Sequence, residues 1–288
     1  MKMQTVFIII IVLLFLVCLG SVIYNYNNIE VSEYEYKSEK VPQSFNGYKI
    51  VQLSDLHSYQ FGEGNKNLIE SIDKINPNII VVTGDMVDNS DKEFTVCMEL
   101  MKKLAQKYEV YYTIGNHEVA FVGEKYVKLI NDLRSTGIHL LMNEKAEIYK
   151  DNEKINIYGM FYNAKYYLKY AKDYVSLDML NSLIPERNNN EFNILLAHNP
   201  LDFKFLSQMN VDLIFSGHVH GGIVRLPGLG GLLSPTVSIF PQYTKGLYSL
   251  GESKMVVSAG LGLGTIPFRI YNTPNLVVTT LIKENIIH

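Results

Sequence analysis

The chain has 288 residues, 47% of them apolar, which is typical of a globular protein with one large domain or two small ones. A formal net charge of −3 and the lack of any run of lysines and arginines exclude a general affinity for nucleic acid. The two cysteines, Cys18 and Cys97, fall in an apolar amino-terminal run and in a predicted helix, so we expect no disulfide within the domain.

The first predicted element is an apolar run from residue 6 to residue 23, interrupted only by Cys18, Gly20 and Ser21. At about 1.5 Å per residue, a helix of this length just crosses the hydrocarbon core of a bilayer. We therefore expect residues 1–24 to form a membrane anchor, a single transmembrane helix. A signal peptide that is removed is the alternative, but the run is long for one and lacks a clear cleavage site.

Charges on either side of the apolar run predict its orientation. Lys2 precedes the run, and acidic residues follow it at Glu30, Glu33 and Glu35. Positive charges beside a span favour the cytoplasmic side. We therefore expect a single-pass protein of the cell membrane whose main domain lies outside the cytoplasm.

Residues 25–45 are polar, rich in tyrosine and interrupted by Pro42, which is typical of a linker. Over residues 46–288, short β-branched runs alternate with amphipathic segments, a pattern that predicts one α/β domain. Strands are predicted at 49–53, 79–83, 110–114, 155–158, 192–197, 213–216, 255–258 and 276–282, and helices at 67–75, 93–106 and 125–134. The glycine-rich stretches 221–231 and 260–264 are expected to be loops.

Five short polar motifs each follow a predicted strand. They are Asp55-Leu56-His57, Gly84-Asp85, Gly115-Asn116-His117-Glu118, His198 and Gly217-His218-Val219-His220. Ligand sites in open α/β sheets assemble beyond the carboxyl ends of strands. We therefore expect side chains that are far apart in the sequence to share one crevice.

Each motif alone has an ordinary structural explanation. Asp and Asn form turns and helix caps, and a single histidine is more often a buried core residue than a ligand. The joint pattern differs, because five of the seven histidines fall within these motifs. Imidazole, carboxylate and carboxamide groups suit Mn²⁺, Zn²⁺ or Fe. The pattern therefore predicts a site for two metal ions.

In this order, the motifs resemble the D-x-H, G-D, G-N-H-E, H and G-H-x-H signature of the calcineurin-like metallophosphoesterase family, over about residues 48 to 282. The segments 221–227 and 260–269 are similar to those of its bacterial membrane-associated branch, which includes exported phosphoesterases and UDP-diacylglucosamine pyrophosphatase-like enzymes. The resemblance implies a fold in which two mixed β-sheets form a sandwich flanked by helices.

The resemblance also implies a division of the ligands between two metals. One metal would be held by Asp55, His57, Asp85 and His220, and the other by Asp85, Asn116, His198 and His218. Asp85 would bridge the two ions, and Mn²⁺ is the expected metal, with Zn²⁺ or Fe as alternatives. His117 would face the substrate instead of binding metal.

The implied activity is hydrolysis of a phosphodiester, a pyrophosphate or a phosphomonoester. A hydroxide that bridges the metals would attack phosphorus in line, while His117 assists the leaving oxygen. Arg269 is a candidate phosphate clamp, because a guanidinium group matches the geometry of phosphate oxygens.

The expected substrate is a phosphorylated small molecule or a lipid-linked one, and a membrane anchor raises the effective concentration of lipid-linked substrates. Two other classes of function remain open from the residues alone. One is a metal-binding scaffold without catalysis, and the other is a metal-dependent hydrolase of carboxylic esters or amides. The sequence does not determine the oligomeric state.

Overall fold

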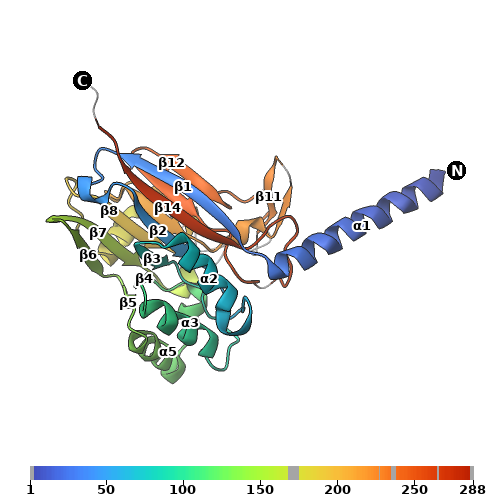
Figure 1. The fold of residues 1–288 in the computed structure, drawn as a ribbon, viewed down its shortest axis with the longest axis horizontal. Coiled ribbons are helices and arrows are strands. Elements are labelled where there is room, and N and C mark those ends of the chain that lie inside the picture. The colour runs from blue at the N-terminus through green and yellow to red at the C-terminus, as the bar shows by residue number, and fades with distance from the viewer. Residues whose placement is uncertain (1–2, 168–174, 227, 235–237, 265, 286–288) are drawn as a thin grey trace.

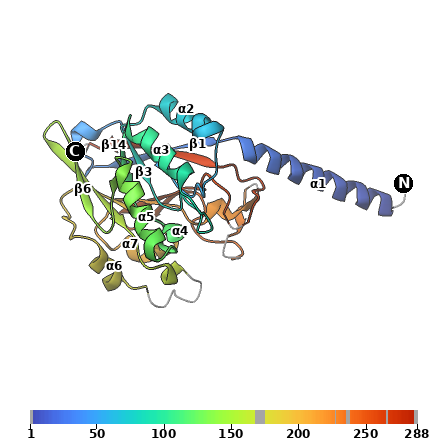
Figure 2. The ribbon, with the colours of Figure 1, turned by 90° about the horizontal axis from the view of Figure 1, so that it is seen from below.

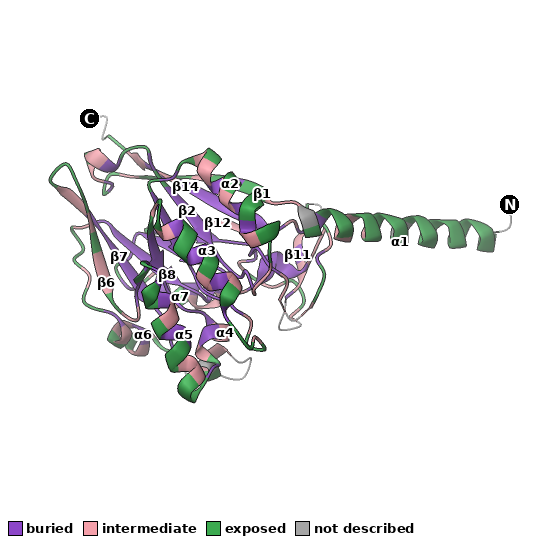
Figure 3. Ribbon diagram, turned by 60° about the horizontal axis from the view of Figure 1, so that its bottom comes forward, coloured by how far each residue is buried: buried purple, intermediate pink, exposed green. Residues whose placement is uncertain are grey.

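A computed structural model describes residues 3–167, 175–226, 228–234, 238–264 and 266–285. The first element, α1 (Met3–Asn27), is a long helix that projects away from the body of the protein in two perpendicular views (Figures 1 and 2). Among the described residues, α1 is the one helix with the length and apolar composition needed to span a membrane, a test that signal sequences also pass. Its side chains are mostly exposed (Figure 3).

The remainder of the chain forms two large mixed sheets. The first sheet has the strand order β1 (Glu30–Ser38), β14 (Asn275–Lys283), β2 (Tyr48–Leu53), β3 (Ile79–Val82), β4 (Glu109–Tyr112) and β5 (His139–Leu140). Strands β2 to β5 are parallel to one another, and β14 runs antiparallel to β2. The carboxyl ends of β2, β3 and β4 therefore lie at the same edge.

The second sheet has the strand order β12 (Gly246–Leu250), β13 (Ser253–Val257), β9 (Leu213–Ser216), β8 (Asn193–Ala197), β7 (Glu153–Met160) and β6 (Lys145–Lys150). The four central strands are parallel, and β12 and β6 are antiparallel edges. A separate hairpin pairs β10 (Val224–Leu226) with β11 (Gly230–Leu233).

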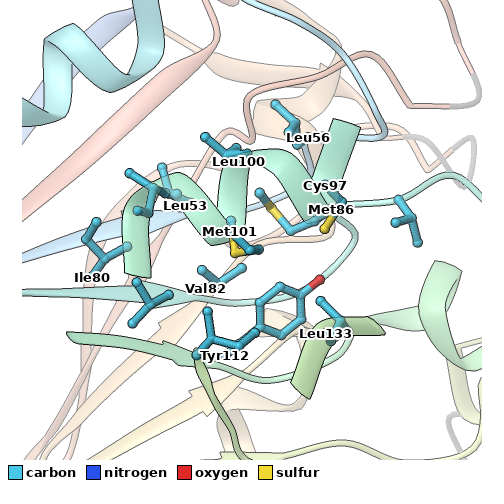
Figure 4. Close-up of a cluster of buried hydrophobic side chains, with 14 of the residues drawn as sticks. Leu53, Leu56, Ile80, Val82, Met86, Cys97, Leu100, Met101, Tyr112 and Leu133 are labelled. Atoms are coloured by element: carbon cyan, nitrogen blue, oxygen red, sulfur yellow. The ribbon is translucent and has the colours of Figure 1, made fainter. Parts of the chain in front are cut away.

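Alternating apolar residues explain why the two sheets pack face to face. In β3, Ile79 and Val81 contribute to the core between the sheets, whereas Ile80 and Val82 pack on the opposite face against helices. Successive side chains of a strand point to opposite faces, so a strand that is apolar at every position is covered on both sides. Figure 4 shows the outer core, where Leu100 and Met101 of α3 (Thr95–Ala105) lie near Leu53 and Val82, respectively.

Helices cover the outer face of each sheet. The core on the first sheet is closed by α2 (Lys66–Ile75), α3 and α5 (Gly123–Ser135), and that on the second by α6 (Leu177–Leu183) and α7 (Phe203–Leu206). The shorter helical elements are η1 (Gln43–Phe45), η2 (Glu63–Asn65), α4 (Asn116–Val119), η3 (Ala164–Tyr167), η5 (Pro200–Asp202) and η6 (His220–Gly222). The predicted fold class, two mixed β-sheets flanked by helices after one apolar helix, is confirmed, and so are the predicted strands and helices listed above.

Two expectations about connecting segments are wrong. Residues 25–45 are not simply a linker, because β1 pairs with β14 in parallel from Glu30 to Ser38. As an edge strand, β1 buries few residues, so its sequence remains polar and charged. The glycine-rich stretch 221–231 is not only a loop either, since it contains β10 and the start of β11.

Candidate metal centre

The predicted ligands lie in loops at the carboxyl ends of parallel strands. The segments after β2, β3 and β4 carry Asp55, His57, Asp85 and Asn116, and those after β8 and β9 carry His198, His218 and His220; Asn116 and His220 are the first residues of α4 and η6. The amide of His218 donates to both carboxylate oxygens of Asp55, at 3.0 and 3.1 Å. This contact joins the loops of the two sheets, so the seven residues converge at one edge of the sandwich.

One group of candidate ligands consists of Asp55, His57 and His220. The Nε2 atoms of His57 and His220 lie 3.0 Å apart, and Nε2 of His220 lies 3.4 Å from Oδ1 of Asp55. All three side chains are buried. Two imidazole nitrogens and a carboxylate oxygen that face one point form a donor set for a divalent cation.

A second group consists of Asp85, His198 and His218. Nε2 of His198 lies 3.1 Å from Oδ2 of Asp85, and the two imidazole rings have centroids 5.0 Å apart. Nδ1–H of His198 donates to the carbonyl of Thr83 at 2.6 Å. A backbone contact of this kind fixes the orientation of a ring and aims Nε2 at the metal position.

Unpaired polar atoms test whether these residues fit metal ions. Nε2 of His198, Nδ1 of His57 and Oδ1 of Asn116 are buried and make no hydrogen bond. Leaving such an atom unpaired costs about 1–3 kcal/mol, so several in one place indicate a missing partner. A cation bound at Nε2 of His198 and Oδ1 of Asn116 would satisfy both, and the nitrogen and oxygen donors fit Mn²⁺, Zn²⁺ or Fe.

The backbone at the candidate ligands is strained. Five of the seven have positive φ angles: Asp55 at 53°, His57 at 46°, Asp85 at 55°, His218 at 70° and His220 at 51°. Residues other than glycine rarely adopt this region, which costs of order 1–3 kcal/mol each. The fold therefore holds these side chains in orientations that an isolated chain would avoid.

Two glycines allow the loops to approach the ligands closely. A Cβ atom at Gly217 would lie 2.0 Å from Oγ of Ser54 and 2.3 Å from Oδ2 of Asp55. A Cβ atom at Gly115 would lie 2.3 Å from Oδ1 of Asp85. Both glycines belong to the motifs, so their small size is part of the geometry that brings the ligands together.

The electrostatics of the site favour neutral rings for His218 and His220, which follow β9, and a positive charge on His198 beside Asp85. Burial and the charge of His198 lower the pKa of His218 to about 3, and burial with His57 and Arg269 holds the pKa of His220 well below its usual value. Both rings are therefore neutral near pH 7, the form that binds metal. Burial opposes a charge on His198, but Asp85 raises its pKa to about 9.

His117 is adjacent to the candidate ligands, with its ring centroid 4.4 Å from that of His57. Its Nδ1 accepts the amide N–H of Asn89 at 3.1 Å. A neutral ring that accepts at Nδ1 carries its proton on Nε2. His117 keeps 13% of its side chain exposed, so the ring is not fully enclosed.

Asp88 is a functional candidate that our sequence interpretation missed. Its Oδ2 lies 3.6 Å from Nδ1 of His57 and 3.4 Å from Nδ1 of His117. The close contact with the His57 ring holds the pKa of Asp88 below its ordinary value, so the carboxylate is charged. The sequence signal was a second aspartate three residues after Asp85, in Gly84-Asp85-Met86-Val87-Asp88.

Glu118 supports the backbone of the candidate site and is not one of the candidate ligands. Its buried carboxylate accepts four hydrogen bonds of 2.8 Å, from the amides of Asp85, Met86 and Gly115 and from the hydroxyl of Tyr112. One side chain thus ties the loop after β3 to the loop after β4. It fixes the backbone on both sides of the proposed bridging carboxylate.

Arg269, the candidate phosphate clamp, lies behind His220. Arg269 is 2% exposed. Its guanidinium group donates to the carbonyls of Ala259 and Gly262, and Nη2 lies 3.3 Å from Nδ1 of His220. With its donors directed at these groups, Arg269 positions the loop behind His220 and presents no free edge to a substrate.

Comparison with known proteins agrees with this geometry. Residues 48–222 match the family model described as calcineurin-like phosphoesterase. The chain is 30% identical over 266 residues to the metallophosphoesterase YkuE of Bacillus subtilis, a match that covers 89% of this chain and 87% of that protein. It is also 22% identical over 304 residues to the UDP-2,3-diacylglucosamine pyrophosphatase LpxG of Chlamydia muridarum, covering 90% and 91% of the two chains.

A third relative bears on the apolar helix. The chain is 29% identical over 252 residues to a transmembrane protein with a metallophosphoesterase domain from Danio rerio, a match that covers 84% of this chain and 54% of that protein. Together with α1, this similarity indicates association with a membrane. The matched family depends on a dinuclear metal centre, for which the two ligand groups provide donors. The chain belongs to the calcineurin-like phosphoesterase family and is a metal-dependent phosphoester hydrolase.

Proposed function

We propose that this chain is a dinuclear phosphohydrolase that cleaves a phosphodiester or pyrophosphate, or a phosphomonoester, on a lipid-linked substrate at a membrane surface. The observation that carries the proposal is the pair of ligand groups at one edge of the sandwich, Asp55 with His57 and His220, and Asp85 with His198 and His218. When bound, two divalent ions would neutralise phosphate oxygens and activate a water molecule as the nucleophile. Mn²⁺ is the metal we propose, with Zn²⁺ or Fe as alternatives.

We assign one ion to Asp55, His57, Asp85 and His220, and the other to Asp85, Asn116, His198 and His218. The grouping of side chains supports this division, because each triad offers ligand atoms within 4.8 Å of one another. Asp85 is the proposed shared ligand. Its Oδ1 accepts the amide N–H of His117 at 2.8 Å, which holds the carboxylate in place.

His117 is the proposed proton donor to the leaving oxygen. The amide of Asn89 occupies Nδ1, so Nε2–H is the group left to face a bound phosphoester. The carboxylate of Asp88, 3.4 Å from Nδ1, stabilises the ring whenever it carries a positive charge.

A hydrolysis screen tests this function. The purified full chain, loaded with Mn²⁺ in detergent, is assayed with an aryl phosphodiester, an aryl phosphomonoester and a nucleotide-sugar lipid. We expect turnover of the diester or the nucleotide-sugar lipid, and loss of that turnover after chelation by EDTA. Failure of the metal-loaded protein to hydrolyse any of the three substrates would contradict the proposal.

The placement of the chain is also a proposal. We assign residues 1–24 to the membrane anchor and residues 46–288 to the catalytic domain outside the cytoplasm, with the intervening β1 added to that domain. The lipid-linked substrate of the LpxG relative supports a membrane-facing role. Protease added to intact cells should digest the domain as fast as in lysed cells, and protection in intact cells would place it in the cytoplasm.

A further inference from the structure

The base of α1 is hydrogen-bonded to one segment of the catalytic domain. Tyr271 donates its amide N–H to Oγ of Ser21 at 2.8 Å. The side chain of Asn25 donates to the carbonyl of Arg269 at 3.0 Å, and the hydroxyl of Tyr26 donates to the carbonyl of Pro267 at 2.7 Å. Contacts from Ser21 to Tyr26, somewhat less than two turns of helix, fix where the segment 267–271 lies along α1.

This attachment places the segment at the boundary of the bilayer. The apolar run of α1 covers residues 6–23, about 27 Å at 1.5 Å per residue, close to the thickness of about 30 Å of a hydrocarbon core. Ser21 lies near the carboxyl end of this run, so Tyr271 lies at the same level. Phe268 and Tyr271 are 38% and 50% exposed there, a position at which aromatic residues are enriched in membrane proteins.

Other exposed apolar residues belong to the same surface. We define the apolar rim as Phe268 and Tyr271 together with Leu229, Ile239 and Phe240, whose exposures are 70%, 72% and 58%. Leu229 lies in the turn between β10 and β11, and the amide of Phe240 donates to Leu232 in β11 at 2.9 Å.

The hairpin is attached to the segment that contacts α1. The amide of Arg225 in β10 donates to the carbonyl of Ile270 at 3.0 Å. Strands β10 and β11 are paired, so the hairpin, the turn at Phe240 and the segment 267–271 form one continuous extension. This extension lies beside the base of α1 in Figures 1 and 3.

The composition of this extension differs from an ordinary exposed surface. The sequence contains no aspartate or glutamate from residue 223 to residue 251, and Arg225 is the one charged residue between 223 and 244. Its guanidinium group donates to the carbonyl of Gly221 at 2.7 Å. Of the ten large apolar residues exposed in the described chain outside α1, half lie in the apolar rim. Clustered exposed apolar residues mark interaction surfaces.

The rim is also adjacent to the metal centre. Asn272 donates to the carbonyl of His220 at 2.6 Å, and Arg269 lies 3.3 Å from the ring of the same histidine. The segment 267–271, which contacts α1 through its backbone, therefore supports a candidate ligand through the side chain of Arg269, and the next residue, Asn272, does the same. A phosphate group at the level of lipid headgroups would lie close to the metal centre.

We propose that the apolar rim inserts into the bilayer surface beside α1, so that the metal centre opens toward the headgroups and acts on phosphoesters embedded in that bilayer. The occupant of the rim is a lipid bilayer, because the rim is continuous with the base of the membrane helix and is almost free of charge. The choice of substrate rests on the proposed function, whereas contact between rim and bilayer is independent of catalysis.

The absence of tryptophan from the chain allows a direct test. Phe240→Trp and Ile239→Trp each place one tryptophan in the rim, and Val122→Trp is the matched control. Val122 is 82% exposed immediately before α5, a helix that lies apart from α1 in Figures 1 and 2. Each full-length variant is reconstituted into vesicles of phosphatidylcholine and phosphatidylglycerol, with or without lipids brominated near the headgroup end of the acyl chains.

We expect brominated lipids to remove most of the emission of the two rim variants and to leave the control unchanged. Iodide in the aqueous phase should quench the control strongly and the two rim variants weakly. Two results would overturn the proposal. One is that iodide quenches the rim tryptophans as strongly as it quenches the control. The other is rim tryptophans shielded from both quenchers, which would mean that a second copy or another protein covers the rim.

A kinetic comparison separates this inference from the proposed function. Ile239→Glu should retain hydrolysis of a soluble aryl phosphodiester but lose most of its activity on a phosphodiester lipid in the same vesicles, while Val122→Glu retains both. Equal activity of the two variants on the lipid would overturn a role of the rim. If the unaltered protein hydrolyses neither the soluble diester nor the phosphodiester lipid, the result instead contradicts the proposed function.

Discussion

Asp85→Asn should remove both metal ions from the protein. The substitution replaces the one carboxylate that we assign to both ions with an amide, which has a single acceptor oxygen and no charge. Substituting a group that only supports a ligand lowers metal affinity about 10- to 100-fold, so loss of a shared ligand should exceed about 100-fold. Metal content after dialysis, measured by mass spectrometry, should fall from two equivalents to near zero, and phosphodiester hydrolysis should fall with it.

Asp212→Asn is a matched control for this experiment. Asp212 is also a buried aspartate, 5% exposed, and it accepts a bond of 2.9 Å from Lys40. It precedes β9 and so lies at the amino end of that strand, opposite the metal centre. This variant should keep its metals even if it is less stable. An Asp85→Asn protein that still holds two equivalents would rule out Asp85 as the shared ligand.

Most of the fold was predictable because its central strands are apolar on both faces. Strands such as β3, in which all four residues are buried, can be recognised from their continuous apolar sequence without knowing which strands lie beside them. β1 lacks such a pattern, since most of its nine residues are at least partly exposed. Its stability derives from pairing with β14, about 240 residues later. Sequence periodicity cannot detect a contact of that kind.

The candidate site was predictable for a different reason. Its ligands are chemically unusual residues that each follow a strand, and parallel strands bring their carboxyl ends together. The supporting residues lack such a signal. Glu118 could equally stabilise a helix start, and Asp88 belongs to a turn. An arginine near a phosphate site invites the role of a clamp, and only its burial shows that Arg269 instead supports His220.

His117→Ala should separate metal binding from proton transfer. His117 contacts Asp85 through its backbone amide, at 2.8 Å from Oδ1, and this bond survives the substitution. Metal content should therefore stay at two equivalents. Turnover should fall by about 10² to 10⁴, the usual contribution of a general acid. Because a proton matters most for a basic leaving oxygen, the loss should grow across a series of aryl phosphodiesters as the pKa of the leaving phenol rises.

The matched control is His139→Ala, which removes a histidine whose side chain is 48% exposed on β5 and paired with Glu109. It should change neither metal content nor turnover. Loss of metal in His117→Ala would make His117 a ligand. An equal loss for every phenol would assign it to binding the phosphoryl group, since a proton donor acts on the leaving oxygen and its effect must follow the basicity of that atom.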